Sequence, residues 1–212
     1  MEKIDFKVTL KEFFGAKPGV FSQVVVPEFT YLMVDGSGDP NTSPQYTVAI
    51  EALYSLSYTL KFLSKGELGR DYTVPPLEGL WWSNDMKDFE SGKKDGWLWT
   101  AMIMVPDWIT PTLLARGTAV AAERKPESDV TRVRREALDE GLSVQTLFVG
   151  PYRDEAPVIA ELHAVYLPQN DLVENGRHHE IYLSDPRRTD PTKLRTIIRQ
   201  PVARIPQTAN TT

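Results

Sequence analysis

Cysteine is absent from the 212 residues of this sequence. Its absence excludes disulfide bonds, thiolate nucleophiles and metal sites with cysteine ligands. Long apolar runs are absent as well, and no stretch approaches the roughly 20 apolar residues of a transmembrane helix. The N-terminal stretch MEKIDFKVTLKEFF has no apolar core after its charges, so we do not interpret it as a signal peptide. These absences predict a cytoplasmic protein with no membrane partner.

An excess of basic residues is also missing. The formal net charge is −5 at pH 7, whereas nucleic-acid binding requires a basic surface. Basic residues gather in RVRREALDEG (132–141), but acidic residues interrupt them, which favours a solvated helix face. The leading segment of about 23 residues is too short for a helix-turn-helix. We therefore expect no direct DNA binding.

Motifs for nucleotide binding and for a Ser–His–Asp triad do not occur either. No G-x-x-x-x-G-K-[ST] loop is present, and the glycine-rich DGSGDP (35–40) is typical of a turn after a strand. His178 and His179 are adjacent, and adjacent strand residues point to opposite faces, so they are poorly placed to hold one metal ion. His163 lies in a different predicted element. The sequence predicts neither a cofactor nor a metal site.

The composition is that of a folded globular protein, with 41% hydrophobic and 25% charged residues. A chain of this length can form one large domain or two small ones that share a core. Residues 1–25 combine charge with Phe13, Phe14 and Phe21, and we predict an N-terminal arm that packs through these rings. Residues 26–212 then form the main domain.

The first half of that domain has the pattern strand, helix, strand, strand. A strand within 28–40 precedes the Ser-Pro pair at 43–44, which suits the N-cap and first position of a helix. Apolar residues then recur at helical spacing until Gly66. Residues 77–84 and 96–108 are apolar strands, and the charged, glycine-containing segment between them predicts an antiparallel hairpin.

The second half repeats this order. A helical connector over about 108–140 is expected to contain two helices, the second reaching its end. Residues 142–206 then show strand, helix, strand and strand, with the helix in 154–170 and the third element in 176–185. The chain therefore contains two weak repeats, about 27–106 and 142–206, of α+β character.

The third elements of the two repeats align as EGLWWS (78–83) and HEIYLS (179–184). Because side chains alternate along a strand, the alignment separates two faces. The helix-covered face would hold Leu80, Trp82, Ile181 and Leu183. The opposite face would hold Gly79, Trp81, Glu180 and Tyr182. If the repeats pair about a pseudo-twofold axis, that face has a carboxylate flanked by aromatic rings and opposed by a glycine, which predicts a pocket.

Four stretches resemble the GyrI-like small-molecule-binding proteins: PPLEGLWW (75–82), GWLWTAMIMVPD (96–107), GPYRDEAP (150–157) and HHEIYLSDPRRTDPTKLRTIIRQPV (178–202). The resemblance is to the stand-alone branch of the family and spans most of the chain from about Pro27. It implies two pseudo-symmetric β-α-β-β (SHS2-like) repeats that form one antiparallel sheet, with helices on one face. It also implies a central groove for hydrophobic, planar or cationic ligands.

The resemblance further implies three classes of function. In several members a glutamate at the base of the groove is the key polar group, and its match here is Glu180. Some stand-alone members hydrolyse the strained cyclopropane of DNA-alkylating natural products, which implies self-protection. Other relatives are effector domains of transcription regulators or bind DNA gyrase. The chain is therefore expected to be a binding module, a hydrolase or an interaction protein.

Glu180 is the candidate catalytic residue. Burial of an unpaired carboxylate costs several kcal/mol, so a carboxylate in an aromatic groove implies a use. Ionised, it would attract a cation held between aromatic faces, with a cation–π contribution of about 1–2 kcal/mol. Alternatively, it would act as a general base that orients water. The plainer alternative is an edge position in which Glu180 pairs with Arg177 or Arg187.

Aromatic residues supply the candidate ligand-binding surface. The candidates are Trp81, Trp82, Trp99, Met102, Tyr58, Tyr152 and Tyr182. For the tryptophans and the methionine a core position is the alternative, and the adjacent Trp81 and Trp82 must face opposite sides of their strand. The repeat alignment favours Trp81 for the groove. The expected partner is a hydrophobic or cationic small molecule, and the sequence leaves monomer and homodimer open.

Overall fold

A large antiparallel sheet dominates the computed structural model, which describes residues 3–83 and 96–206. Within these residues its strands are β2 (Ser22–Val26), β3 (Phe29–Ser37), β5 (Leu77–Ser83), β6 (Trp97–Met104), β7 (Arg134–Leu138), β8 (Gly141–Val149), β9 (Leu172–Glu174), β10 (His178–Tyr182) and β11 (Arg195–Arg204). They pair in the order β2-β8-β11-β10-β5-β6-β3-β7, and β9 pairs with β11. Two short strands, β1 (Lys3–Ile4) and β4 (Asp71–Tyr72), form a separate parallel pair.

The order of the strands shows the pseudo-twofold relation of the two repeats. Strands β3, β5 and β6 of the first repeat mirror β8, β10 and β11 of the second, and β5 pairs with β10 at the centre. The aligned residues Gly79 and Glu180 are themselves paired in register. The pseudo-axis therefore passes between them, and the predicted strand–helix–strand–strand repeats and single sheet are confirmed.

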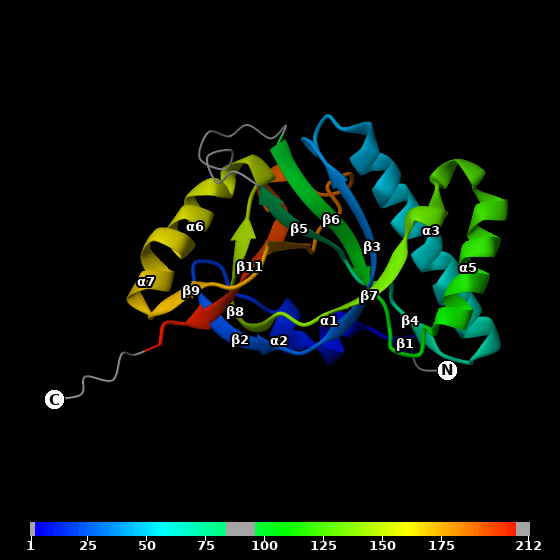
Figure 1. Cartoon of the computed structure of the whole chain (residues 1–212), viewed down its shortest axis with the longest axis horizontal. Helices are drawn as coiled ribbons and strands as arrows, with labels where there is room; N and C mark the ends of the chain where they lie inside the picture. The colour runs from blue at the N-terminus through cyan, green and yellow to red at the C-terminus, as the bar shows by residue number, and fades with distance from the viewer. Residues whose placement is uncertain (1–2, 84–95, 207–212) are drawn as a thin grey trace.

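The longer helices cover the sheet on one face. They are α3 (Pro44–Glu67), α5 (Pro111–Arg124) and α6 (Ala156–Glu161), which continues through a π-helical turn (Leu162–Tyr166) into α7 (Leu167–Gln169). In the view of Figure 1, α3 and α5 lie to the right of the central strands, and α6 and α7 lie to the left. The short helices α1 (Phe6–Thr9) and α2 (Lys11–Phe14) lie at the bottom of the view. Short 3-10 turns occur at Pro126–Ser128, Val130–Arg132, Tyr152–Asp154 and Pro191–Lys193.

Local chemistry explains where the main helices begin and how closely they pack. Pro44 occupies the first turn of α3 after Ser43, and Thr110 caps α5 by accepting a hydrogen bond from Leu113 N. A Cβ added at Gly117 of α5 would lie 2.5 Å from Cδ2 of Leu60 in α3. Glycine at this position therefore allows the two helices to approach each other closely.

Both faces of the sheet are buried in its central part. On the face toward α3, Trp81, Trp99 and Ile103 pack with the apolar side of that helix. On the opposite face, Phe13 and Phe14 of the N-terminal arm pack with Met102, Ile181 and their neighbours. This burial on both sides agrees with the apolar sequence of the central strands.

Three details of the sequence prediction are wrong. Residues 134–138 form strand β7 beside β3, whereas a helix was predicted there. Residues 22–25, which the prediction assigns to the N-terminal arm, belong to strand β2 of the main sheet. The helices cover the face that carries Trp81 and Glu180, whereas the other face is covered by the arm. Strand alternation determines which residues share a face, but it does not determine which face the helices cover.

The predicted β5–β6 hairpin pairing is confirmed, although most of the connecting segment, 84–95, lies outside the described residues. In the described part of the chain, no helix is both long and apolar enough to cross a membrane.

Candidate functional site

An open groove of about 2030 Å³ lies on the helix-covered face of the sheet. Its aromatic lining includes Tyr46, Tyr54 and Tyr58 from α3, Trp81 from β5, Tyr152 from the turn after β8, and Tyr182 from β10. Small-molecule sites commonly occupy about 300–1,000 Å³, so the groove has room for a multi-ring ligand.

Glu180 lies at the centre of the sheet, on β10 between β5 and β11. Its side chain is 13% exposed. The Tyr182 hydroxyl donates a 2.8 Å hydrogen bond to Glu180 Oε2 and accepts a 3.1 Å hydrogen bond from Trp81 Nε1. A chain of hydrogen bonds therefore runs from one repeat to the carboxylate of the other.

The alternative of an edge carboxylate paired with arginine is contradicted. Arg187 forms an ion pair with Asp185 at 2.9 Å, between its Nη2 and the carboxylate Oδ2. The Arg177 guanidinium lies 3.6 Å from the centroid of the Trp82 ring. The central position of β10 therefore directs Glu180 into the groove rather than toward solvent at a sheet edge.

Gly79 makes the approach of Trp81 and Tyr182 possible. A Cβ added at Gly79 would lie 2.8 Å from Trp81 Nε1 and 3.2 Å from the Tyr182 hydroxyl. The sequence predicted that this glycine leaves space opposite Glu180. In the structure the indole and the phenol occupy that space.

Burial and the charge of Glu180 keep the neighbouring tyrosines protonated. Burial first, and then the Glu180 charge, raise the pKa of Tyr182 and of Tyr46 well above the usual value. Burial, Glu155 and Glu180 together raise the pKa of Tyr152 to about 12. These phenols are therefore neutral hydrogen-bond donors around a carboxylate at ordinary pH.

His178 and Glu155 are two groove residues that the sequence reasoning missed. His178 lies two residues before Glu180 on β10, so the two side chains point to the same face of the sheet. It is 9% exposed, and its Nε2 atom lies 3.4 Å from Glu180 Oε1. Glu155 follows the turn that holds Tyr152 and is 3% exposed. Strand parity was a signal for His178, but no sequence pattern indicated that Glu155 would face the groove.

The predicted ligand-binding residues divide into two groups. Trp81, Tyr182, Tyr152 and Tyr58 line the groove, and Tyr152 and Tyr182 meet with ring centroids 5.4 Å apart. Trp82 points to the opposite face of β5 from Trp81, but its ring also contributes to the groove lining and packs against the Arg177 guanidinium.

Two of the predicted residues do not line the groove. Trp99 is fully buried beneath Tyr46, with ring centroids 4.9 Å apart, and it packs against Gly36. Met102 is fully buried with Phe13 and Phe14 on the other face of the sheet. The structure contradicts the predicted groove position of both residues, because each is enclosed in a core cluster.

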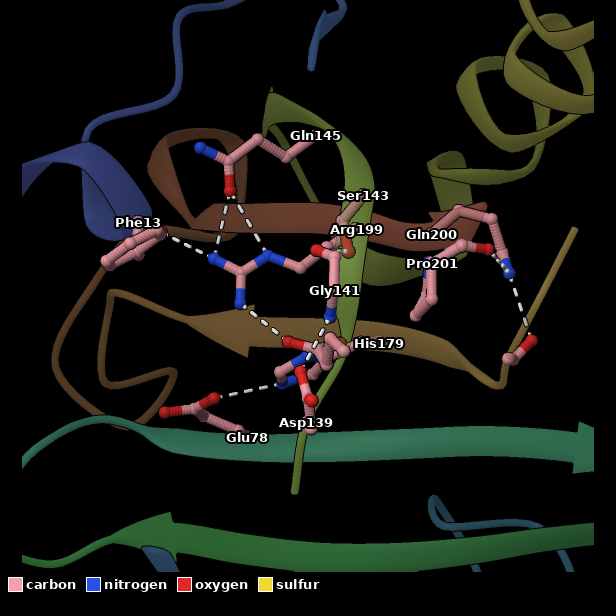
Figure 2. Close-up of polar contacts among 12 residues, drawn as sticks. Phe13, Glu78, Asp139, Gly141, Ser143, Gln145, His179, Arg199, Gln200 and Pro201 are labelled. Carbon is pink, nitrogen blue, oxygen red and sulfur yellow. Dashed lines mark hydrogen bonds and ion pairs between the residues drawn. The ribbon is translucent and has the colours of Figure 1, made fainter. Parts of the chain in front are cut away.

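A buried ionic network lies on the other face of the sheet, behind Glu180. Figure 2 shows His179 next to Glu78, and Arg199 next to Gln145 and Phe13. His179 bonds Glu140 through Nδ1 and Glu78 through Nε2, each at 2.9 Å. Arg199 bonds Glu140 at 3.0 Å and the Phe13 carbonyl at 2.7 Å. The network therefore joins both repeats, the connector and the arm.

Among the described residues, no three His, Asp or Glu side chains are arranged to hold a metal ion.

The fold and the groove define a class of protein: a two-repeat α+β domain with an aromatic groove that has one carboxylate at its centre. The sequence matches the GyrI-like small molecule binding domain over residues 21–203, and the chain belongs to this family. The family that the sequence resembled is thereby confirmed. A comparison with curated proteins found no match.

Solved structures from Listeria innocua are similar over nearly the whole chain. An uncharacterized conserved protein is 41% identical with a TM-score of 0.87, and a hydrolase is 39% identical with a TM-score of 0.82. In both comparisons the match covers 95% of this chain and 100% of the other. The EcmrR C-terminal domain, at 10% identity, TM-score 0.55, and coverage of 88% of this chain and 98% of that one, shares the fold.

Proposed function

We propose that the groove binds hydrophobic, planar and especially cationic small molecules in the cytoplasm, with Glu180 as the central charged group. The observation that carries this proposal is a largely buried carboxylate at the centre of an aromatic groove. A cation placed there gains the attraction of the carboxylate and of the faces of the surrounding rings. The neighbouring tyrosines stay neutral, so they add donors without competing charge.

The test compares two ligands of the same shape that differ in charge. N-methylquinolinium carries a permanent positive charge, and 1-methylnaphthalene is its neutral counterpart. We expect Glu180→Gln to weaken binding of the cation about 10- to 100-fold, which corresponds to the loss of a partly buried charge–charge contact, while the neutral ligand is affected little.

Glu136→Gln serves as the matched control, because Glu136 is an exposed carboxylate of strand β7. It should leave both affinities unchanged. Equal weakening of both ligands by Glu180→Gln, or no saturable binding of either, would contradict a charge-selecting groove.

We further propose that the groove hydrolyses cyclopropane-bearing alkylators, and so protects its cell from them. Two features support this activity: a similar Listeria innocua protein is described as a hydrolase, and Glu180 lies beside a phenol donor. Water would attack the cyclopropane methylene while the strained C–C bond breaks, and the released electron pair would move to the conjugated carbonyl, forming a phenolate. Glu180 would take the proton of the attacking water, and Tyr182 would donate to the developing phenolate.

Mass spectrometry of the products tests the hydrolysis directly. With a cyclopropane-bearing indole alkylator we expect an adduct of one water, formed faster with the protein than without it. Glu180→Gln should lower that rate at least about 100-fold, a typical effect of removing a general base. Tyr182→Phe should lower it while leaving the base in place. If the water adduct forms no faster with the wild-type protein, the hydrolase proposal is wrong.

A non-catalytic role is the alternative. The protein would then sequester or sense the same ligands, as an effector domain does, or would modulate a partner such as gyrase. The similarity to the EcmrR domain shows the fold alone. Saturable, Glu180-dependent binding without any turnover would favour this alternative over hydrolysis.

A further inference from the structure

His178 lines the groove, and both of its ring nitrogens are buried. It is 9% exposed, and within residues 3–83 and 96–206 neither ring nitrogen makes a hydrogen bond. Buried polar atoms are nearly always hydrogen-bonded, so a histidine with two unbonded buried nitrogens requires an explanation. Its Nε2 atom lies 3.4 Å from Glu180 Oε1, close enough for an ion pair when the ring is protonated.

The two oxygens of Glu180 have different surroundings. Oε2 accepts the hydrogen bond of Tyr182, whose raised pKa keeps that donor neutral. Oε1 faces His178. The charge that the carboxylate presents to a ligand therefore depends on the protonation of one neighbour, because the other neighbour does not ionise in the same pH range.

Two carboxylates lie near His178. Glu180 lies on the same strand, and Glu174 on β9 is close enough for His178 to lower its pKa, after the larger effect of His163. His163 Nδ1 lies 2.6 Å from Glu174 Oε1, so Glu174 is paired mainly with His163. On β5 the residue in register with His178 is Trp81, which carries no charge.

We infer that His178 sets the charge available at Glu180 and makes the binding of cations depend on pH. The imidazolium pairs with the Glu180 carboxylate and repels a ligand cation. The neutral imidazole leaves the carboxylate free for that cation. This inference rests on the proposed binding of cations in the groove, and His178 acts through Glu180 as a positioning residue.

Thermodynamic linkage gives the inference a measurable consequence. If protonation of His178 opposes the cation, then binding of the cation must release protons to the same extent. Histidine ordinarily changes charge between pH 5 and 8. In this range the affinity for N-methylquinolinium should rise about ten-fold with pH, equivalent to a one-unit change in a pKa, and its binding should release up to about half a proton per molecule bound. The neutral 1-methylnaphthalene should release none.

The experiment is calorimetric titration from pH 5.5 to 8 in two buffers with different ionisation enthalpies, which counts the protons released. His178→Gln should bind the cation without proton release and with nearly constant affinity from pH 6 to 8. Glu136→Gln is again the control, because Glu136 is an exposed carboxylate of strand β7. It should keep both the proton release and the pH dependence.

The possible results separate this inference from the proposed function. Glu180-dependent binding of the cation with unchanged proton release in His178→Gln would overturn the role of His178 and leave the groove function intact. No saturable binding, or binding independent of Glu180, would overturn the groove function and the inference with it. If His178→Gln does not fold, the Cε1 proton resonance of His178 is followed in the wild type, and its titration must move to lower pH when the cation is added.

Discussion

At the scale of single residues, Gly79 determines how the two repeats meet at Glu180. We expect Gly79→Ala to displace the Trp81 indole, because the new methyl carbon would lie 2.8 Å from its Nε1 atom. The hydrogen bond from Trp81 to Tyr182 would be lost, and the free energy of unfolding should fall by about 1–3 kcal/mol, as is usual for overpacking. Tryptophan fluorescence and chemical denaturation measure the two effects.

Gly66→Ala is the matched control for this substitution. Gly66 lies in α3, and a Cβ added there meets no atom within 4 Å. It should raise the free energy of unfolding by about 0.5–1 kcal/mol, because alanine is the better helix residue. If Gly79→Ala behaved like Gly66→Ala, the close contact at the groove would not limit this position.

The sequence was informative about individual site residues only where strand periodicity applied. Parity and repeat alignment placed Trp81, Tyr182 and Glu180 together, and the structure has them on one face. The same parity includes His178, whose importance depends on a distance to Glu180 that the sequence does not contain. Trp99 and Met102 were assigned to the groove by residue type, and tertiary packing encloses both.

At the scale of elements, features that depend on nearby residues were predicted correctly, whereas strand β7 was not. The Ser-Pro start of α3 and the β5–β6 hairpin depend on nearby residues, and both occur in the structure. Strand β7 depends on pairing with β3, from Arg134 with Met33 to Leu138 with Phe29. Its charged sequence is also compatible with a helix, so long-range pairing, supported by the 2.8 Å ion pair of Arg134 with Asp35, decides its conformation.

At the scale of the whole molecule, the pseudo-twofold axis brings two different chemical sites together on opposite faces of one strand pair. Glu180 faces the groove, whereas its neighbour His179 points into the ionic network with Glu78 on β5. Through Arg199 the same network holds the arm, since Phe13 O accepts from Nη2. The groove floor is thus supported from behind by charges that belong to both repeats, and the stability of the network should affect the whole fold.

The network should make the stability of the protein depend on pH in a defined direction. Burial alone would lower the pKa of His179, but the carboxylates of Glu140 and Glu78 outweigh burial and raise it from 6.5 to about 9. Burial alone would raise the pKa of Glu140, but His179 and Arg199 lower it from 4.5 to about 2. Both residues therefore stabilise the fold in their charged forms.

A raised histidine pKa stabilises the folded state fully below the unfolded pKa, and this contribution is lost as pH rises through the folded pKa. The His179 contribution should therefore fall between about pH 6.5 and 9, and that of Glu140 should fall between about pH 4.5 and 2. Urea denaturation of the wild type should show a decreasing free energy of unfolding from pH 6.5 to 9. His179→Gln should be less stable at pH 6 and should lose most of this slope, whereas His163→Gln should keep it. A wild-type stability that stays constant or increases over that range would show that His179 is not held as an imidazolium between the two carboxylates.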